Sequence, residues 1–326
     1  MRSELLVSAV LLGLLSAICG GGALAQSGAY PVKTIRVLVP FSAGGTTDVM
    51  GRLVAQRLSA AYGQQVLIEN RTGAGGHIAA ELVARAPADG YTLMVGSIGI
   101  HAAHASYTKL TYDPTKDLQP VILMAEVPLV MLVHPSLPPR NVKDFIVLAR
   151  SKPGEINYGS AGFGSSTHMT GALFEMMANV KLAHIPFKGS GQAVVALGAG
   201  HVDFSMENLG PVLPMVQSNR VRLLAVASHA RHPQEPNVPT FRQAGLPEVN
   251  LATWIFLMAP AATPEAVVTL LNRTINDILK MPDTREKLLQ QGFVHTGGTV
   301  EEMTQRMKTE ATLWGAVIKN ANITVQ

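Results

Sequence analysis

The sequence contains little cysteine and little charge. Its 326 residues include one cysteine, Cys19, and charged residues make up 15% of the chain. Cys19 lies in a leading segment that we expect to be removed, so the mature protein would have no thiol catalysis, disulfides or thiolate metal sites. The net charge is +4 and the basic residues are scattered along the chain, which predicts no nucleic-acid partner.

Apolar runs long enough to cross a membrane are absent after the first segment. Residues 1–25 have the pattern of a secretory signal peptide: a basic start at Arg2, an apolar stretch, and the cleavage site Ala23-Leu24-Ala25 before Gln26. The alternative, a membrane anchor, requires about 20 apolar residues, more than this stretch provides. We therefore expect cleavage after Ala25 and export to the periplasm.

The mature chain alternates between two kinds of segment. Short β-branched runs such as 35–39, 65–69 and 91–95 predict buried strands, and helical periodicity over 47–62 and 78–85 predicts helices between them. The alternation returns from residue 157 to 225, and the tail predicts helices over 264–280 and 300–319. Proline-rich stretches at Pro128, 135–139 and 233–247 predict loops and crossings. This order predicts an α/β fold with parallel sheets, in two similar halves.

Two glycine loops each follow a strand and precede a helix. The first glycine loop, residues 40–48, has the sequence PFSAGGTTD, and the second glycine loop, residues 157–168, has the sequence NYGSAGFGSSTH. Glycine lets the backbone approach a ligand, and the first N–H groups of a helix lack internal partners and favour an anion. If the two halves face each other, the two helix starts would share one cleft suited to a small carboxylate. An ordinary capped turn is the alternative for each loop.

Nucleotide and metal sites are not expected. A third loop, residues 70–77, also joins a strand to a helix, but none of the three loops completes G-x-G-x-x-G or a P-loop. His101 and His104 have the helical spacing of a zinc pair, yet no H-E-x-x-H motif accompanies them. We therefore predict no cofactor and no metal.

An ordered set of short strings carries a family resemblance. Along the mature chain these are PFSAGG (40–45) with Asp48 and Arg52, NR (70–71) with GAGG (73–76), ADGYTL (88–93), YDP (112–114), GS (164–165) with His168, PFKG (186–189), PT (239–240) with AG (244–245), Trp254, and AP (259–260) with TP (263–264). In this order the strings resemble the tripartite tricarboxylate transporter receptors, also called Bug receptors, over essentially the whole mature chain.

The resemblance implies a periplasmic-binding-protein-like fold, in which two α/β domains are joined by a hinge and a ligand cleft lies between them. It divides the chain into domain 1, residues 26–127 and 252–326, and domain 2, residues 128–251, with crossings near Val127 and Leu251. It also implies that a carboxylate is held between the two glycine loops, partly through ordered water. Carried over, the ligand-binding residues are Phe41, Ala43, Gly44, Gly45, Thr46, Asp48, Gly164, Ser165, Ser166, Thr167 and His168.

Some polar residues keep a second interpretation. Asp48 could stabilise its helix start or bind an amine, and His168 could pack or touch the ligand. Lys188 could attract an anion or stay solvated, and Trp254 could pack near a crossing or line the cleft. Departures from the family pattern are Thr72, Phe187 in place of a common Tyr, Gln192 and Asn219.

The resemblance implies a non-enzymatic receptor that captures a small organic carboxylate by domain closure and passes it to membrane permease subunits. We expect a monomer. A second hypothesis is that the loaded receptor signals to a membrane sensor. A third, a secreted hydrolase, requires a serine hydroxyl bonded to a histidine that a carboxylate orients, and the sequence has no G-x-S-x-G motif.

Overall fold

The computed structural model describes residues 30–102, 110–247, 249 and 252–320. From Lys33 onward the described residues form one compact unit. The expected signal segment with Cys19, His104 and the crossing residue Leu251 lie outside the described residues. None of the described helices has the length and hydropathy of a membrane span.

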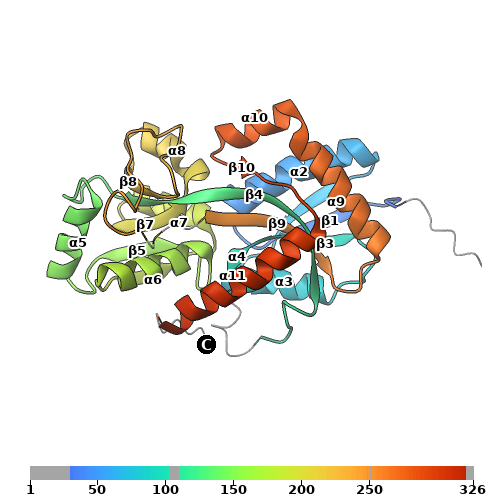
Figure 1. Ribbon diagram of the computed structural model, residues 1–326, viewed down its shortest axis with the longest axis horizontal. Coiled ribbons are helices and arrows are strands. Elements are labelled where there is room, and N and C mark those ends of the chain that lie inside the picture. The colour runs from blue at the N-terminus through green and yellow to red at the C-terminus, as the bar shows by residue number, and fades with distance from the viewer. Residues whose placement is uncertain (1–29, 103–109, 248, 250–251, 321–326) are drawn as a thin grey trace, which may run out of the picture. The chain divides into compact units, whose positions relative to one another are not determined.

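The first half contains a parallel three-stranded core (Figure 1). It comprises β1 (Ile35–Val39), α2 (Thr46–Tyr62), β2 (Val66–Asn70), a short 3-10 turn η1 (Ala74–Gly76), α3 (His77–Ala84), β3 (Thr92–Ser97) and α4 (Ile98–Ala102). β1 lies between β2 and β3 and pairs with both in parallel. The predicted strands and helices of this half are confirmed within one or two residues, because β-branched runs and helical periodicity coincide with buried positions here.

The second half repeats the alternation. It comprises α5 (Val142–Ser151), β5 (Asn157–Ser160), α6 (Ser166–Ala178), β6 (Ala183–Pro186), α7 (Ser190–Gly198), β7 (Phe204–Asn208), α8 (Leu209–Gln217) and β8 (Arg222–Ala227). β5 pairs in parallel with β6 and β7. Apolar clusters cover both faces of its sheet, one around Phe145, Phe174 and Phe204, the other around Leu197 and Val212.

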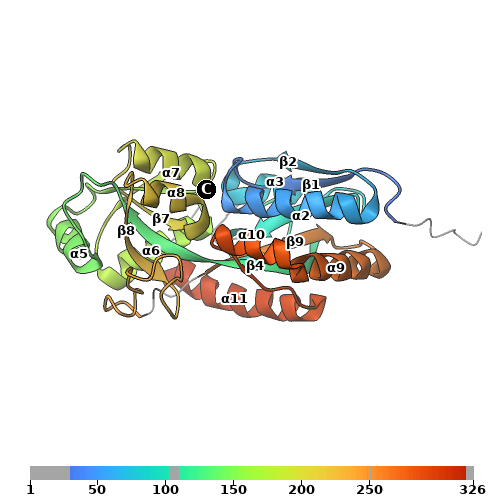
Figure 2. The same ribbon diagram turned by 90° about the horizontal axis from the view of Figure 1, so that it is seen from above.

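Two antiparallel strands join the halves, which corrects the expectation of parallel sheets throughout. β4 (Leu118–Val133) and β9 (Ala252–Pro260) run side by side, and Figure 2 shows β4 extending from one group of helices to the other. β4 pairs with β9 up to Pro128 and with β7 and β8 from Leu129 onward. Pro128 therefore lies inside a strand rather than in a loop, at the change of partner. The domain limits at 127/128 and 251/252 remain a prediction. The change of strand partner after Pro128 supports it.

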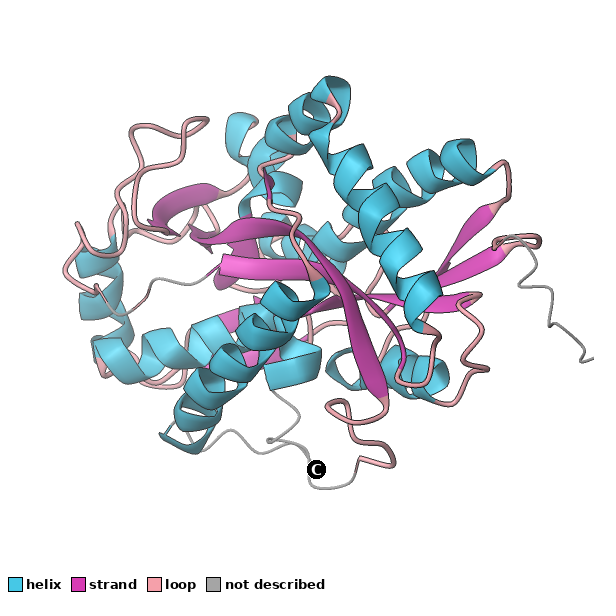
Figure 3. Cartoon of the chain, turned by 45° about the vertical axis from the view of Figure 1, so that its right-hand side comes forward, coloured by secondary structure: helices cyan, strands magenta, loops and turns pink. Residues whose placement is uncertain are grey.

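The C-terminal segment returns to the first half. α9 (Glu265–Lys280), α10 (Pro282–Gln290), β10 (Val294–His295) and α11 (Val300–Asn320) follow β9, and Figure 3 shows helices on both sides of the strands. At the start of α11 the N–H of Thr299 donates to Glu302 and the N–H of Glu302 donates to Thr299, a reciprocal pair typical of a helix start. Ten strands form one continuous sheet in the order β2-β1-β3-β9-β4-β7-β5-β6, with β8 and β10 also paired to β4.

Successive side chains of the crossing strand β9 point to opposite faces of the sheet, and Trp254 is an example. Thr253 and Ile255 line a small cavity between the halves, whereas Trp254 packs on Phe256 beneath the guanidinium of Arg306. Neighbouring side chains of a strand point to opposite faces, so Trp254 is directed away from that cavity. Its interpretation as a packing residue near the crossing agrees with an exposed fraction of 1%.

Candidate functional site

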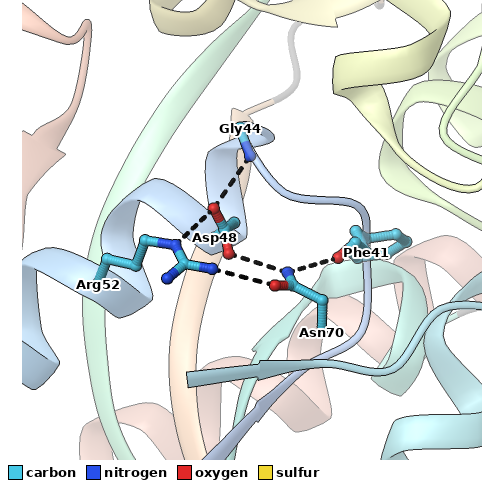
Figure 4. Close-up of polar contacts among 5 residues, drawn as sticks. All are labelled: Phe41, Gly44, Asp48, Arg52 and Asn70. Carbon is cyan, nitrogen blue, oxygen red and sulfur yellow. Dashed lines mark hydrogen bonds and ion pairs between the residues drawn. The ribbon is translucent and has the colours of Figure 1, made fainter. Parts of the chain in front are cut away.

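A network around Asp48 holds the first glycine loop (Figure 4). One carboxylate oxygen of Asp48 accepts hydrogen bonds from the N–H of Gly44 at 3.0 Å and from Nε of Arg52 at 2.9 Å. The amide of Asn70 donates to the other oxygen and to the carbonyl of Phe41, both at 2.9 Å. Burial acts to raise the pKa of Asp48, but these hydrogen bonds outweigh it and hold the pKa below its ordinary value. Asp48 thus braces the loop as an anion.

Side chains of the second glycine loop also bond within the loop. Ser165 caps α6, since its hydroxyl accepts a hydrogen bond from the N–H of His168 at 3.2 Å. The hydroxyl of Thr167 accepts from the N–H of Ala161 at 2.8 Å. Both residues are buried. They fix the backbone between β5 and α6, so the start of α6 is presented in a defined position.

His168 is buried behind this loop. Its Nδ1 accepts a hydrogen bond from the N–H of Gly164 at 3.1 Å, and its ring stacks on His184 with 4.1 Å between centroids. Burial lowers the pKa of His168 to about 4, so the ring is neutral at neutral pH. A neutral imidazole whose Nδ1 accepts from the backbone is a loop support in this arrangement.

A small cavity, which we name the inner chamber, lies between the two halves. Its volume is about 20 Å³, and helix starts and strand ends from both halves line it. Such a volume holds about one water molecule. The lining residues are Phe41, Gly45, Thr46, Thr47, Ser97, Ala161, Ser165, Ser166, Ser190, Asn208, Thr253 and Ile255.

Four helix N-termini meet at the inner chamber. They belong to α2, α6, α7 and α8, and their first or capping residues supply six of the lining positions: Gly45, Thr46, Ser165, Ser166, Ser190 and Asn208. Each helix start carries partial positive charge and unpaired N–H groups, so four of them together create a positive potential without a charged side chain. None of the described residues that line the inner chamber is charged.

Three buried polar atoms at the inner chamber have no partner within the described protein. They are Thr46 Oγ1, Ser97 Oγ and Asn208 Oδ1, on residues that are 3%, 2% and 4% exposed. Leaving a buried polar group without a hydrogen bond costs about 1–3 kcal/mol. Polar atoms left in this state around one cavity indicate a place built for water or for a polar ligand group.

A larger cavity, the outer chamber, adjoins the inner one. Its volume is about 560 Å³, and Phe41 and Ala161 border both cavities. The first half contributes Gly73–Gly76, Ile78 and Tyr112, and the second half contributes 161–163 and 186–188, so this space also lies between the halves. Lys188, exposed, is among its lining residues.

The expected binding residues divide into three groups. Phe41, Gly45, Thr46, Ser165 and Ser166 line the inner chamber. Ala43 and Gly44 line an open groove of about 830 Å³ on the other side of the first loop, whereas the remaining members line none of the cavities described here: Asp48, Gly164, Thr167 and His168. Ligand contact by any of these residues stays a prediction.

Sequence reasoning missed Ser97, Ser190 and Asn208 in the inner chamber. Ser97 ends β3, Asn208 ends β7, and Ser190 begins α7 after β6. The missed signal is positional, because polar residues at carboxyl ends of strands gather at one edge of an α/β sheet. Each is a single polar residue with no neighbouring motif, so the string alone gave little reason to choose it.

The hydrolase hypothesis has one geometric candidate. The hydroxyl of Ser160 lies 2.6 Å from Nε2 of His184, but Nδ1 of His184 is buried and has no partner among the described residues, so no carboxylate orients the ring. Burial, with His168 adding to it, lowers the pKa of His184 to about 3, which makes it a poor base. Ser160 has no exposed surface. The pair lacks the third group of a triad.

Comparisons with known proteins show the family of the chain. A family model described as tripartite tricarboxylate transporter family receptor matches residues 50–323. Protein BugT of Bordetella pertussis is 34% identical over 311 residues, which cover 95% of each chain. The structure of Rhodopseudomonas palustris Rpa4515 with adipate has 39% identity and a TM-score of 0.88, covering 90% of this chain and 99% of the other. MatC from the same organism, with bound malate, has 36% identity and a TM-score of 0.86, covering 89% of this chain and 100% of the other. The chain therefore belongs to the receptor family of the tripartite tricarboxylate transporters, the family of periplasmic solute-binding proteins that includes the Bug proteins.

Proposed function

We propose that this protein captures a small organic carboxylate in the periplasm by domain closure and delivers it to a membrane permease of the tripartite tricarboxylate type. The observation that carries the proposal is the meeting of four helix N-termini at a cavity bordered by unpartnered polar atoms. Binding involves no covalent step, and the expected signal peptide over residues 1–25 accounts for export. A monomer suffices, since the site is built within one chain.

The two chambers would have different roles. The inner chamber, about 20 Å³, has room for a water molecule but not for a carboxylate. We place the carboxylate where Phe41 and Ala161 join the chambers, with water relaying hydrogen bonds that the hydroxyls of Thr46 and Ser97 donate, while Asn208 Oδ1 accepts one from the water. Water-mediated hydrogen bonds are nearly as favourable in enthalpy as direct ones. Support comes also from the relatives whose structures hold adipate and malate.

The test is a thermal-shift screen of the mature chain against organic acids, sugars and cations. A ligand at 100 times its Kd stabilises the folded state by about 2.7 kcal/mol. We expect at least one carboxylate to raise the melting temperature and the neutral compounds to leave it unchanged. Stabilisation by sugars or cations alone would contradict the carboxylate assignment.

A paired variant links the binding to the inner chamber. Thr46→Val removes the unpartnered hydroxyl with little change in shape, and we expect roughly 3- to 10-fold weaker binding, the worth of a hydrogen bond to the relaying water. Thr309→Val is the control, since this exposed threonine of α11 bonds only to its own helix in the described contacts. Equal affinities of the two variants would exclude Thr46 from the site.

Delivery to a permease requires a cellular measurement. We expect a gene deletion to abolish uptake of the labelled acid found in the screen, and the intact gene to restore it. If uptake persists while the transcriptional response to the acid disappears, the receptor signals to a membrane sensor instead.

A further inference from the structure

The outer chamber is lined mainly by apolar side chains. Three of its aromatic residues, Phe41, Phe163 and Phe187, carry no polar atom in their rings. At about 560 Å³ it falls within the range of pockets that enclose drug-sized ligands. A two- or four-carbon acid would leave most of this space to water.

Two exposed apolar residues stand at the chamber, one from each half. Ile78 on α3 is 47% exposed and Phe163 in the second glycine loop is 42% exposed, and both line the chamber. The ring of Phe163 is held in place, because it forms a T-shaped contact with His184, with 4.9 Å between centroids and an interplanar angle of 89°. A ring fixed in this way offers a preformed surface to an apolar ligand group.

The charges around the outer chamber do not favour a second ligand carboxylate. Apart from His77, the charged residues among its described lining residues are one base, Lys188, and one acid, Glu81. Glu81 is paired with Arg85 at 2.7 Å, which leaves Lys188, an exposed lysine whose ion pair with a ligand would strengthen binding at most about fivefold, or about 1 kcal/mol. The hydroxyl of Tyr112 lies 2.7 Å from Nδ1 of His77, so these two groups bond to each other. A second carboxylate in this chamber would lose hydration against apolar walls with little return.

We propose that the preferred ligand is a monocarboxylate with a bulky apolar, ring-containing body that packs between Ile78 and Phe163 in the outer chamber. Its single carboxylate lies at the junction with the inner chamber. This inference rests on the proposed receptor function and narrows its substrate class. It differs from the dicarboxylates adipate and malate bound by two relatives.

Isothermal titration calorimetry of the mature chain with three acids separates the contribution of a second carboxylate from that of a ring. Hexanoate has the six-carbon chain of adipate with a methyl group in place of the second carboxylate, so this pair measures the effect of the second charge, and 3-phenylpropionate adds a ring to an acid of similar reach. We expect 3-phenylpropionate to bind tightest and hexanoate to bind at least as tightly as adipate. Tighter binding of adipate than of both monoacids would overturn the inference while leaving the receptor function intact.

Alanine variants test where the ring of the bound acid lies. Phe163→Ala and Ile78→Ala should each weaken 3-phenylpropionate about tenfold through lost apolar contact and weaken hexanoate less. Val147→Ala on α5 is the control, because Val147 is 69% exposed and lines none of the chambers. Equal affinity of all three variants for 3-phenylpropionate would overturn the assignment of the ring site. Failure of every carboxylate, in this set and in the wider screen, would instead refute the proposed function.

Discussion

The carboxyl group of Glu207 lies 2.9 Å from the hydroxyl of Ser205, and that hydroxyl also lies 2.8 Å from the carbonyl of Gly159. A hydroxyl has one proton and a carbonyl can only accept, so Ser205 donates to Gly159 and Glu207, when protonated, donates to Ser205. Complete burial raises the pKa of Glu207 to about 8, although the hydroxyls of Ser190 and Ser205 oppose the shift. Glu207 is therefore a neutral acid at neutral pH.

The first prediction concerns ligand affinity above this pKa. Ser190 interacts with Glu207 and lines the inner chamber, so ionisation of Glu207 places a negative charge near the anion site. We expect affinity for a carboxylate to fall as the pH rises through about 8, and Glu207→Gln to bind with little dependence on pH from 6.5 to 9.5. Titration calorimetry across this range is the measurement. Parallel profiles for the two proteins would contradict the coupling.

Unfolding gives a separate readout of the same group. The pKa of Glu207 is about 8 in the folded protein and near the ordinary 4.5 when unfolded, so the folded state holds the extra proton between these values. Stability from this group is therefore present at low pH and is lost as the pH rises from about 4.5 to 8. Urea unfolding of Glu207→Gln should show a flatter decline over this window.

The sequence predicted much of the fold because local pattern and burial agree over most elements. The strand over 35–39 and the helix over 47–62 lie within one residue of their expected limits. The antiparallel crossing by β4 and β9 could not be predicted from alternation, because nothing local specifies which strand a chain segment will pair with after a long separation. Pro128, which lies inside β4, also counted against a strand there.

The site was predicted in part, for a related reason. The glycine loops are recognisable strings, and five of the binding residues predicted in them line the inner chamber, among them Thr46 and Ser166. Ser97 and Asn208 are brought to the same cavity by sheet topology alone. Whether Asp48 braces a loop or contacts a ligand likewise depends on where Arg52 and Asn70 lie, which spacing does not determine.

The second prediction tests Asp48 as a brace. Asp48→Asn weakens the charge-assisted bonds to Gly44 and Arg52, and we expect unfolding free energy to fall by about 1–3 kcal/mol at pH 7. Because the pKa of Asp48 is lowered in the folded state, this stability is present above the ordinary value and is lost as the pH falls through the folded value. Urea unfolding at pH 7 and at lower pH is the measurement.

The control for Asp48 is Asp277→Asn, which changes an exposed aspartate of α9. We expect a change within about 0.5 kcal/mol for this surface substitution. If both variants lose the same stability, the contacts of Asp48 do not brace the first glycine loop.

The third prediction concerns close backbone contact between the halves. A Cβ atom added to Gly210, on α8, would lie 1.7 Å from the carbonyl oxygen of Gln291, and one added to Gly99 would lie 2.4 Å from that of Gly164. Neither backbone can yield as a flexible side chain can. We expect Gly210→Ala and Gly99→Ala to remain folded but to close incompletely, with at least about tenfold weaker ligand binding from a misaligned site.

Small-angle scattering with and without ligand measures this closure. We expect the ligand-induced decrease in radius of gyration to be smaller in the two variants than in the unaltered protein. Gly315→Ala is the control, because a Cβ there meets no atom within 4 Å, and alanine within α11 should stabilise the helix by about 0.5–1 kcal/mol. Full closure and unaltered affinity of Gly210→Ala would show that this contact does not limit closure.

The fourth prediction follows from the stacked pair His168 and His184. Burial lowers the pKa of His168 to about 4 and of His184 to about 3, whereas both return to about 6.5 when the chain unfolds. The unfolded state therefore binds more protons below about pH 6.5, and stability falls as the pH drops from there toward 4, by up to about 1.4 kcal/mol per pH unit for each group.

His168→Gln, which keeps a hydrogen-bond acceptor for the N–H of Gly164, should reduce this acid dependence by about half while costing some stability at pH 7. Urea unfolding between pH 4.5 and 7.5 measures both effects, with His134→Gln as the control because His134 bonds to the neighbouring Ser136 away from the stacked pair. An unchanged slope for His168→Gln would mean that this ring is protonated in the folded protein at mildly acidic pH, contrary to its burial against His184.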